Sequence, residues 1–110
     1  MKNLFLVLLL AFTGFHSWAE AKEVLLDVRT PEEYSEGHIP QAINIDVKNQ
    51  NFKTEVAKLD REDSYKVYCR SGKRSQQAVG IMKDLGFKHL ENLGGLEEAK
   101  KALKVETLTK

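Results

Sequence analysis

Cysteine is almost missing from this sequence: among its 110 residues only Cys69 carries a thiol. Without a second thiol the chain cannot form an internal disulfide, so its stability has to come from a packed core. The single thiol itself has three possible roles, as a buried bystander, an intermolecular link or a reactive group.

Proline is also scarce, and neither sign of charge is in excess. The chain has two prolines, 42% hydrophobic and 30% charged residues, and a net charge of +1. This composition excludes disordered and fibrous chains and indicates one globular domain. The balanced charge gives no reason to expect a nucleic acid or an anionic membrane as partner, so any electrostatic specialisation must be local.

Long apolar runs are absent except at the N-terminus. Leu4 to Phe15 is nearly all apolar, Lys2 precedes it, and Ser17-Trp18-Ala19-Glu20-Ala21 offers two small-x-small cleavage sites. This order is typical of a secretory signal, and the run is shorter than the about 20 residues of a spanning helix. We therefore expect residues 1–21 to be a signal peptide, cleaved near residue 19 or 21, and a periplasmic mature protein without stable membrane insertion. A permanent membrane anchor is the less favoured alternative.

The rest of the chain alternates between two kinds of segment. Short apolar runs typical of buried strands cover residues 23–28, 42–45, 66–69 and 89–93. Amphipathic segments typical of helices cover residues 30–37, 52–59, 76–85 and 96–103. In the first helix Thr30 is the expected N-cap, with Pro31 at the first helical position and Glu33 three residues after the cap. The alternation predicts an α/β fold with a mostly parallel central sheet flanked by helices, followed by a tail over residues 105–110.

Cys69 ends the third expected strand, and chemistry in parallel sheets gathers at the carboxyl ends of strands. The loop that follows contains Arg70, Ser71, Gly72, Lys73 and Arg74, and Ser75 is the expected N-cap of the next helix. A tight turn here would direct backbone N–H groups and a helix N-terminus toward one point, while glycine permits a positive φ. Such a cradle would hold the sulfur as thiolate or persulfide, and the three cations could meet an anionic donor.

Three segments resemble the rhodanese family of sulfurtransferases. Residues 69–75, Cys-Arg-Ser-Gly-Lys-Arg-Ser, match its C-x-x-G-x-R-S active-site loop. Residues 26–34 and 37–45 match its N-terminal signature, and residues 92–96 resemble its glycine-pair segment. Together they cover nearly the whole mature chain, which is most similar in kind to exported, single-domain thiosulfate sulfurtransferases of the phage-shock type.

The resemblance implies a single rhodanese-like domain over residues 22–104 and a two-step reaction. The Cys69 thiolate would take the outer sulfur of thiosulfate, release sulfite and pass its persulfide to a thiophilic acceptor such as cyanide. Residues 70–75 would form the substrate loop, and Asp27 and Arg29 would brace the site. The resemblance implies no metal or organic cofactor, and we expect a monomer. One departure is Leu96, which stands where the family often has Trp after the glycine pair.

Other interpretations stay open at this point. A cysteine phosphatase would also cradle an anion over a strand-end thiol, but its signature places five residues between Cys and Arg, whereas four separate Cys69 from Arg74. A non-catalytic rhodanese module acting as a binding domain, or a persulfide carrier that needs a partner, would share the fold. Lys73 could be only a solvated residue of the turn, and His38 is expected to be structural.

Overall fold

The computed structural model of the protein describes residues 21–109. The predicted signal peptide, residues 1–21, therefore lies outside the described part except for Ala21. No helix within residues 21–109 combines the length and the apolar character needed to cross a membrane.

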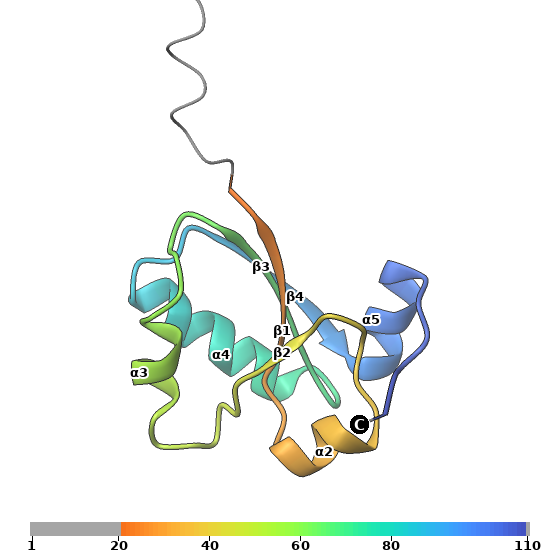
Figure 1. Ribbon diagram of the computed structural model, residues 1–110. Coiled ribbons are helices and arrows are strands. Elements are labelled where there is room, and N and C mark those ends of the chain that lie inside the picture. Colours follow the sequence, from red (N-terminus) through yellow and green to blue (C-terminus); the bar gives the residue numbers. More distant parts are fainter. Residues whose placement is uncertain (1–20, 110) are drawn as a thin grey trace, which may run out of the picture.

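Within the described residues, four strands form one sheet in the order β2-β1-β3-β4. They are β1 (Glu23–Asp27), β2 (Ile43–Asn44), β3 (Ser64–Cys69) and β4 (His89–Gly95). Every pair is parallel, which confirms the predicted α/β fold and makes the described sheet parallel throughout. All four carboxyl ends therefore meet at one edge of the sheet, the lower edge in Figure 1, where helix α2 (Pro31–Glu36) lies.

Helices cover both faces of the sheet, so each face has its own core. On one side α3 (Phe52–Val56) and α4 (Lys73–Asp84) pack on a cluster that includes Leu26, Val67 and Cys69. On the other, α5 (Leu96–Leu103) packs on a smaller cluster around Tyr68. Because successive strand residues point to opposite faces, Tyr68 and Cys69 belong to different cores.

The starts of α2 and α4 show where local sequence signals were enough to predict a helix boundary and where they were not. At α2 the predicted capping box is present, since the Thr30 hydroxyl accepts from Glu33 N–H and the Glu33 carboxylate accepts from Thr30 N–H. At α4 the prediction was wrong. The helix begins at Lys73, its N-cap is Gly72, and Ser75 lies inside the first turn. Gly72 adopts φ +105, and this left-handed turn brings the chain into the helix earlier than a serine cap would.

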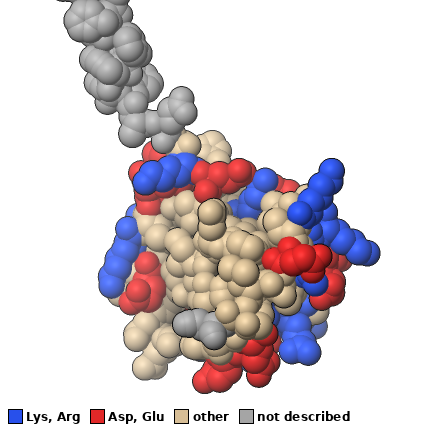
Figure 2. Space-filling view, turned by 45° about the vertical axis from the view of Figure 1, so that its right-hand side comes forward, with Lys and Arg blue, Asp and Glu red and all other residues tan. Residues whose placement is uncertain are grey.

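The C-terminal segment lies against the domain. Val105 packs on the second core, and the backbone groups of His38 and Leu108 exchange two hydrogen bonds of 2.8 Å. On the face shown in Figure 2, acidic and basic side chains surround an uncharged centre, and neither sign forms a continuous patch there.

Candidate active site

Cys69 is the last residue of β3, and its side chain has no exposed surface. The chain turns sharply after it, and the Gly72 N–H donates to the sulfur at 2.9 Å. Burial alone raises the pKa of the Cys69 thiol. Hydrogen bonds from the Ser75 hydroxyl and from the backbone N–H groups of Ser75, Gly72 and Ser71 outweigh it, and the pKa falls below its ordinary value. The loop therefore favours a negatively charged sulfur.

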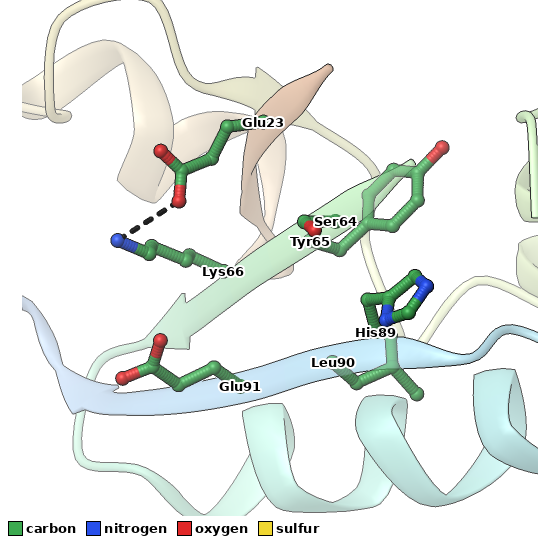
Figure 3. Close-up of a pocket in the computed structure, with 7 residues that line it drawn as sticks. All are labelled: Glu23, Ser64, Tyr65, Lys66, His89, Leu90 and Glu91. Atoms are coloured by element: carbon green, nitrogen blue, oxygen red, sulfur yellow. Dashed lines mark ion pairs between the residues drawn. The ribbon is translucent and has the colours of Figure 1, made fainter. Parts of the chain in front are cut away.

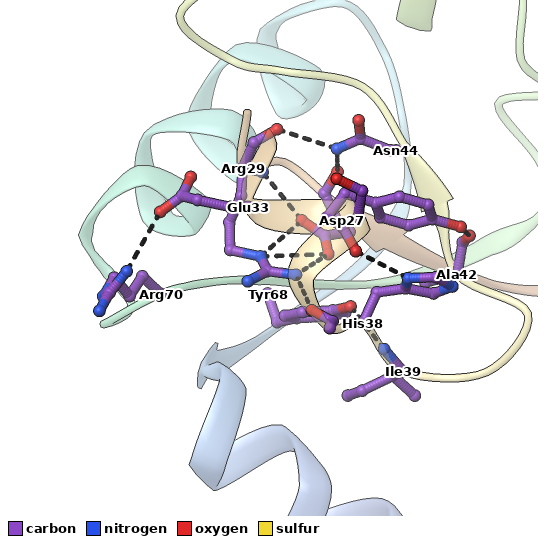
Figure 4. A network of polar contacts seen from close by, with 12 residues as sticks. Asp27, Arg29, Glu33, His38, Ile39, Ala42, Asn44, Tyr68 and Arg70 are labelled. Carbon is purple, nitrogen blue, oxygen red and sulfur yellow. Dashed lines mark hydrogen bonds and ion pairs between the residues drawn. The ribbon is translucent and has the colours of Figure 1, made fainter. Parts of the chain in front are cut away.

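The loop arginines are held by a carboxylate from α2. The guanidinium of Arg74 donates to both oxygens of Glu33, at 2.9 and 3.0 Å. Arg70 lies 3.7 Å from the same carboxylate, and its side chain is 73% exposed. Figure 4 shows Arg70 directed toward Glu33. The hydrogen bonds from Arg74, followed by that from the Thr30 N–H, lower the pKa of Glu33 to about 2 against the effect of burial. Glu33 is thus ionised at every physiological pH and fixes Arg74 beside the loop.

The glycine pair supports the loop from behind. Gly95 is in register with Cys69 on the neighbouring strand, and Ser71 makes an isolated bridge to Gly95. A Cβ at Gly95 would collide with the Arg70 carbonyl oxygen and with the Cα of Ser71. Gly95 is therefore required by the close approach of two backbones, whereas Gly94 is favoured by its φ of +90.

Ser75 is connected to β4 by Asn92. The Ser75 hydroxyl lies 2.6 Å from the Asn92 Oδ1 atom and 3.1 Å from the Gly72 carbonyl oxygen. The same Asn92 oxygen accepts from Gly94 N–H at 2.8 Å, where β4 bulges. One amide thereby ties the bulge of β4 to the first turn of α4.

Asp27 and Arg29 form a buried ion pair at the end of β1. Arg29 Nη2 donates to Asp27 at 2.7 Å and to the Gly37 carbonyl oxygen at 2.7 Å, and Arg29 Nε donates to Asp27 at 3.0 Å. Burial lowers the pKa of Arg29, but its bonds to Asp27 raise it above the ordinary value. Asn44 donates to the Asp27 and Arg29 carbonyl oxygens (Figure 4). These contacts join β1, β2 and the segment after α2.

A groove of about 350 Å³ opens beside the loop. Glu36 of α2, Arg70 of the loop, and Leu96 and Lys100 of α5 are among the residues that line it. Leu96 is thus a rim residue, at the position where the family often has Trp.

A second hollow lies at the opposite edge of the sheet, at the amino ends of β1, β3 and β4. Figure 3 shows its residues around the Lys66–Glu23 ion pair of 3.0 Å. It is remote from the carboxyl ends, where parallel sheets place their chemistry. Among residues 21–109 no group of three or more His, Cys, Asp or Glu side chains is placed to hold a metal ion.

A buried thiol at the end of a central parallel strand, followed by a short basic loop, is typical of one class of proteins. Comparison with known sequences identifies that class. The profile of the rhodanese-like domain matches residues 13–102, so the chain belongs to the rhodanese family. The family predicted from the motifs is confirmed.

Two relatives and a solved structure illustrate the similarity. Thiosulfate sulfurtransferase PspE of Escherichia coli K12 is 42% identical over 78 residues, which cover 71% of this chain and 75% of that protein. The putative sulfurtransferase YtwF of Bacillus subtilis 168 is 38% identical, with 71% and 74% covered. A rhodanese from E. coli, solved with anions, superposes with a TM-score of 0.65 at 37% identity, covering 80% of this chain and 99% of that one.

The predicted site residues fall into three groups. Cys69 and Ser75 are buried, Gly72 and Arg74 are half-buried, and Arg70, Ser71 and Lys73 are exposed. Asp27 and Arg29 are also buried, and they contact each other at the end of β1. Two residues of the constellation were missed: Glu33, which was interpreted only as a capping residue, and Asn92, which was noted only as part of the glycine-pair segment. For Glu33 the family signature was the available signal, because it places this carboxylate in a fixed block before the loop.

Proposed function

We propose that this protein is a thiosulfate sulfurtransferase that works through a persulfide on Cys69. The observation that carries the proposal is the buried thiol at the strand end, whose pKa is lowered by the Ser75 hydroxyl and by the N–H groups of Ser75, Gly72 and Ser71, in a chain of the rhodanese family. A relative named thiosulfate sulfurtransferase, 42% identical over most of the chain, supports thiosulfate as donor.

Sulfur transfer takes two displacements at sulfur. The Cys69 thiolate attacks the outer sulfur of thiosulfate, a new S–S bond forms, and sulfite leaves with the electron pair of the bond that breaks. Cyanide, or another thiophilic acceptor, then attacks the outer sulfur of the persulfide. A carbon–sulfur bond forms, the S–S bond breaks, and its electron pair returns to Cys69 as thiolate, with thiocyanate as product.

The loop holds the negative charge through both steps. The backbone N–H groups of Ser71, Gly72 and Ser75 face the sulfur and stabilise the anionic form, as preorganised donors do in an oxyanion hole. The side chains of Arg70 and Lys73 are exposed. Arg70 lines the groove, and Lys73 is the first residue of α4. Their positive charges attract the anionic donor. Arg74, held by Glu33, adds a fixed positive charge, and Asp27 with Arg29 braces the end of the neighbouring strand β1.

Replacement of the nucleophile tests the proposal. Cys69→Ser keeps the size of the side chain, so we expect native circular dichroism and thiocyanate formation at the background rate. Mass spectrometry of the unmodified protein after thiosulfate treatment should show one added sulfur. Thiocyanate formation by Cys69→Ser at the parent rate would refute the assignment. A persulfide without turnover on cyanide would indicate the carrier function, and turnover of an aryl phosphate without a persulfide would indicate a phosphatase.

We further propose that the protein is exported, with a signal peptide in residues 1–21 that is cleaved near residue 19 or 21, and with a domain over residues 22–104. The support is the signal-like order of the N-terminus. Intact mass of the protein from a periplasmic extract should correspond to a chain that begins at Glu20 or Lys22. Full-length protein in the membrane fraction would indicate the anchor instead.

A further inference from the structure

Asn92 has more contacts with the active-site loop than a surface residue of an edge strand requires. Its Oδ1 atom accepts from the Ser75 hydroxyl at 2.6 Å and from Gly94 N–H at 2.8 Å, and its Nδ2 atom lies 3.4 Å from the Gly72 carbonyl oxygen. Gly72 in turn donates its N–H to the Cys69 sulfur. Two series of contacts therefore connect the Asn92 amide to the thiol. One runs through Gly72, whose N–H donates to the sulfur, and the other runs through Ser75, whose hydroxyl lowers the pKa of Cys69.

The route through Ser75 involves a single proton. A hydroxyl has one O–H to donate, and the Ser75 hydroxyl is fully buried, so no water competes for it. Its geometry places that proton on Asn92 Oδ1, with the Gly72 carbonyl oxygen as a longer alternative. The same hydroxyl is also the first of the hydrogen-bond donors that lower the pKa of Cys69. It cannot serve Asn92 and the sulfur at once.

We propose that Asn92 is a positioning residue for the reaction: its carbonyl oxygen competes with the Cys69 sulfur for the one hydroxyl proton of Ser75. While the sulfur is a neutral thiol, the proton rests on the amide. When the sulfur becomes a thiolate or a persulfide anion, the proton turns toward it, because a hydrogen bond to a charged acceptor is the stronger one. Asn92 thus keeps the resting thiol less acidic than the loop alone would make it. The inference rests on Cys69 being the nucleophile.

The charged groups around the loop are the same in the parent and in a neutral variant at position 92. They are Arg70, Lys73 and Arg74 on the loop and α4, Glu33 on α2, Asp46 after β2, and Glu98 on α5. A neutral substitution leaves these charges unchanged. Any shift of the Cys69 titration midpoint that it causes therefore comes from the Ser75 proton or from the geometry of the loop.

Direct titration of Cys69 measures the competition. The ultraviolet absorbance of the thiolate is followed against pH, with Cys69→Ser as the blank, which is possible because the chain has no other cysteine. For Asn92→Ala we expect the titration midpoint to fall by about half a pH unit, since only the more distant Gly72 carbonyl oxygen then competes with the thiolate for the Ser75 proton. For Asn92→Asp we expect a rise of about one pH unit, because a carboxylate holds the proton more strongly and adds a negative charge.

A purely structural role for Asn92 predicts the opposite sign for Asn92→Ala. A loosened loop would lose N–H groups from the sulfur, and the midpoint would rise. The double variant Ser75→Ala/Asn92→Ala separates the two causes. If the competition is real, this double variant titrates like Ser75→Ala alone. If Asn92 only stiffens the loop, its removal raises the midpoint in both backgrounds, and the proposal is overturned.

The result is independent of turnover. Loss of sulfur transfer in Cys69→Ser tests the proposed function, whereas the sign of the midpoint change tests Asn92. A fall in Asn92→Ala that vanishes without Ser75 supports the inference even if the physiological donor is another sulfane sulfur compound. An unchanged midpoint in both Asn92 variants overturns it while leaving the sulfurtransferase proposal intact.

Discussion

The carboxylate of Glu33 serves two neighbours at once. One of its oxygens closes the capping box of α2 with the Thr30 N–H, and both oxygens accept from Arg74. The first contact is local and was predicted from the spacing of the two residues. The second joins residues 41 positions apart and had no signal in the local pattern. A residue with a recognised capping role can therefore have a second role in the site that the local pattern does not indicate.

Glu33→Gln should destabilise the protein in a pH-dependent way. The folded-state pKa of Glu33 is about 2, against an ordinary 4.5, so its ionised form contributes stability that is present above pH 4.5 and is lost as pH falls toward 2. We expect the variant to lose about 1–2 kcal/mol of unfolding free energy at pH 7, after allowing for solvent screening. Urea unfolding at pH 7 and at pH 3 should show that the difference from the parent shrinks in acid.

Glu32→Gln is the matched control for this prediction. Glu32 is exposed in the same first turn of α2 and experiences the same helix dipole. We expect a change within about 0.5 kcal/mol. An equal loss in both variants would mean that the dipole, and not Arg74, accounts for the effect of Glu33.

At the scale of the elements, the glycine pair of β4 and the active-site loop form one unit. Gly95→Ala should force them apart, because the new Cβ meets the Arg70 carbonyl oxygen and Ser71. We expect a cost of about 1–3 kcal/mol, typical of overpacking, and at least tenfold slower thiocyanate formation. Thermal unfolding and the cyanide assay measure the two effects separately.

Gly80→Ala is the control within a helix. Gly80 is exposed on α4, and a Cβ there meets nothing within 4 Å. We expect the substitution to stabilise the protein by about 0.5–1 kcal/mol with sulfur transfer unchanged. If Gly95→Ala behaved in the same way, the close approach of loop and β4 would not matter for the site.

Much of the element order could be predicted from the sequence because strand and helix signals are local. Thr30, Pro31 and Glu33 together specify the start of α2. The start of α4 could not be predicted in this way, because a serine before an amphipathic run is typical of an N-cap. Here Gly72 takes the cap position, and the Ser75 hydroxyl is directed to Asn92, 17 residues further along the chain. Contacts between distant segments decide such cases.

At the scale of the whole molecule, the C-terminal segment should contribute to stability. It adds the two His38–Leu108 hydrogen bonds and the packing of Val105. A chain ending at Lys104 should lose about 1–2 kcal/mol of unfolding free energy relative to the full chain. A chain ending at Leu108 is the control and should unfold like the parent. Equal stability of all three chains would show that the segment is a passive tail.

The strand order bears on when the chain can fold. β1 is the first strand to be synthesised, yet it lies inside the sheet between β2 and β3. Its longest pairing is with β3, which arrives late: Glu23 is in register with Ser64, and Asp27 is in register with Tyr68. No sheet can close around β1 until most of the chain is available, and such distant pairings form slowly. A polypeptide delivered through a membrane from its N-terminus would therefore be unable to complete the pairing of β1 until β3 has also emerged.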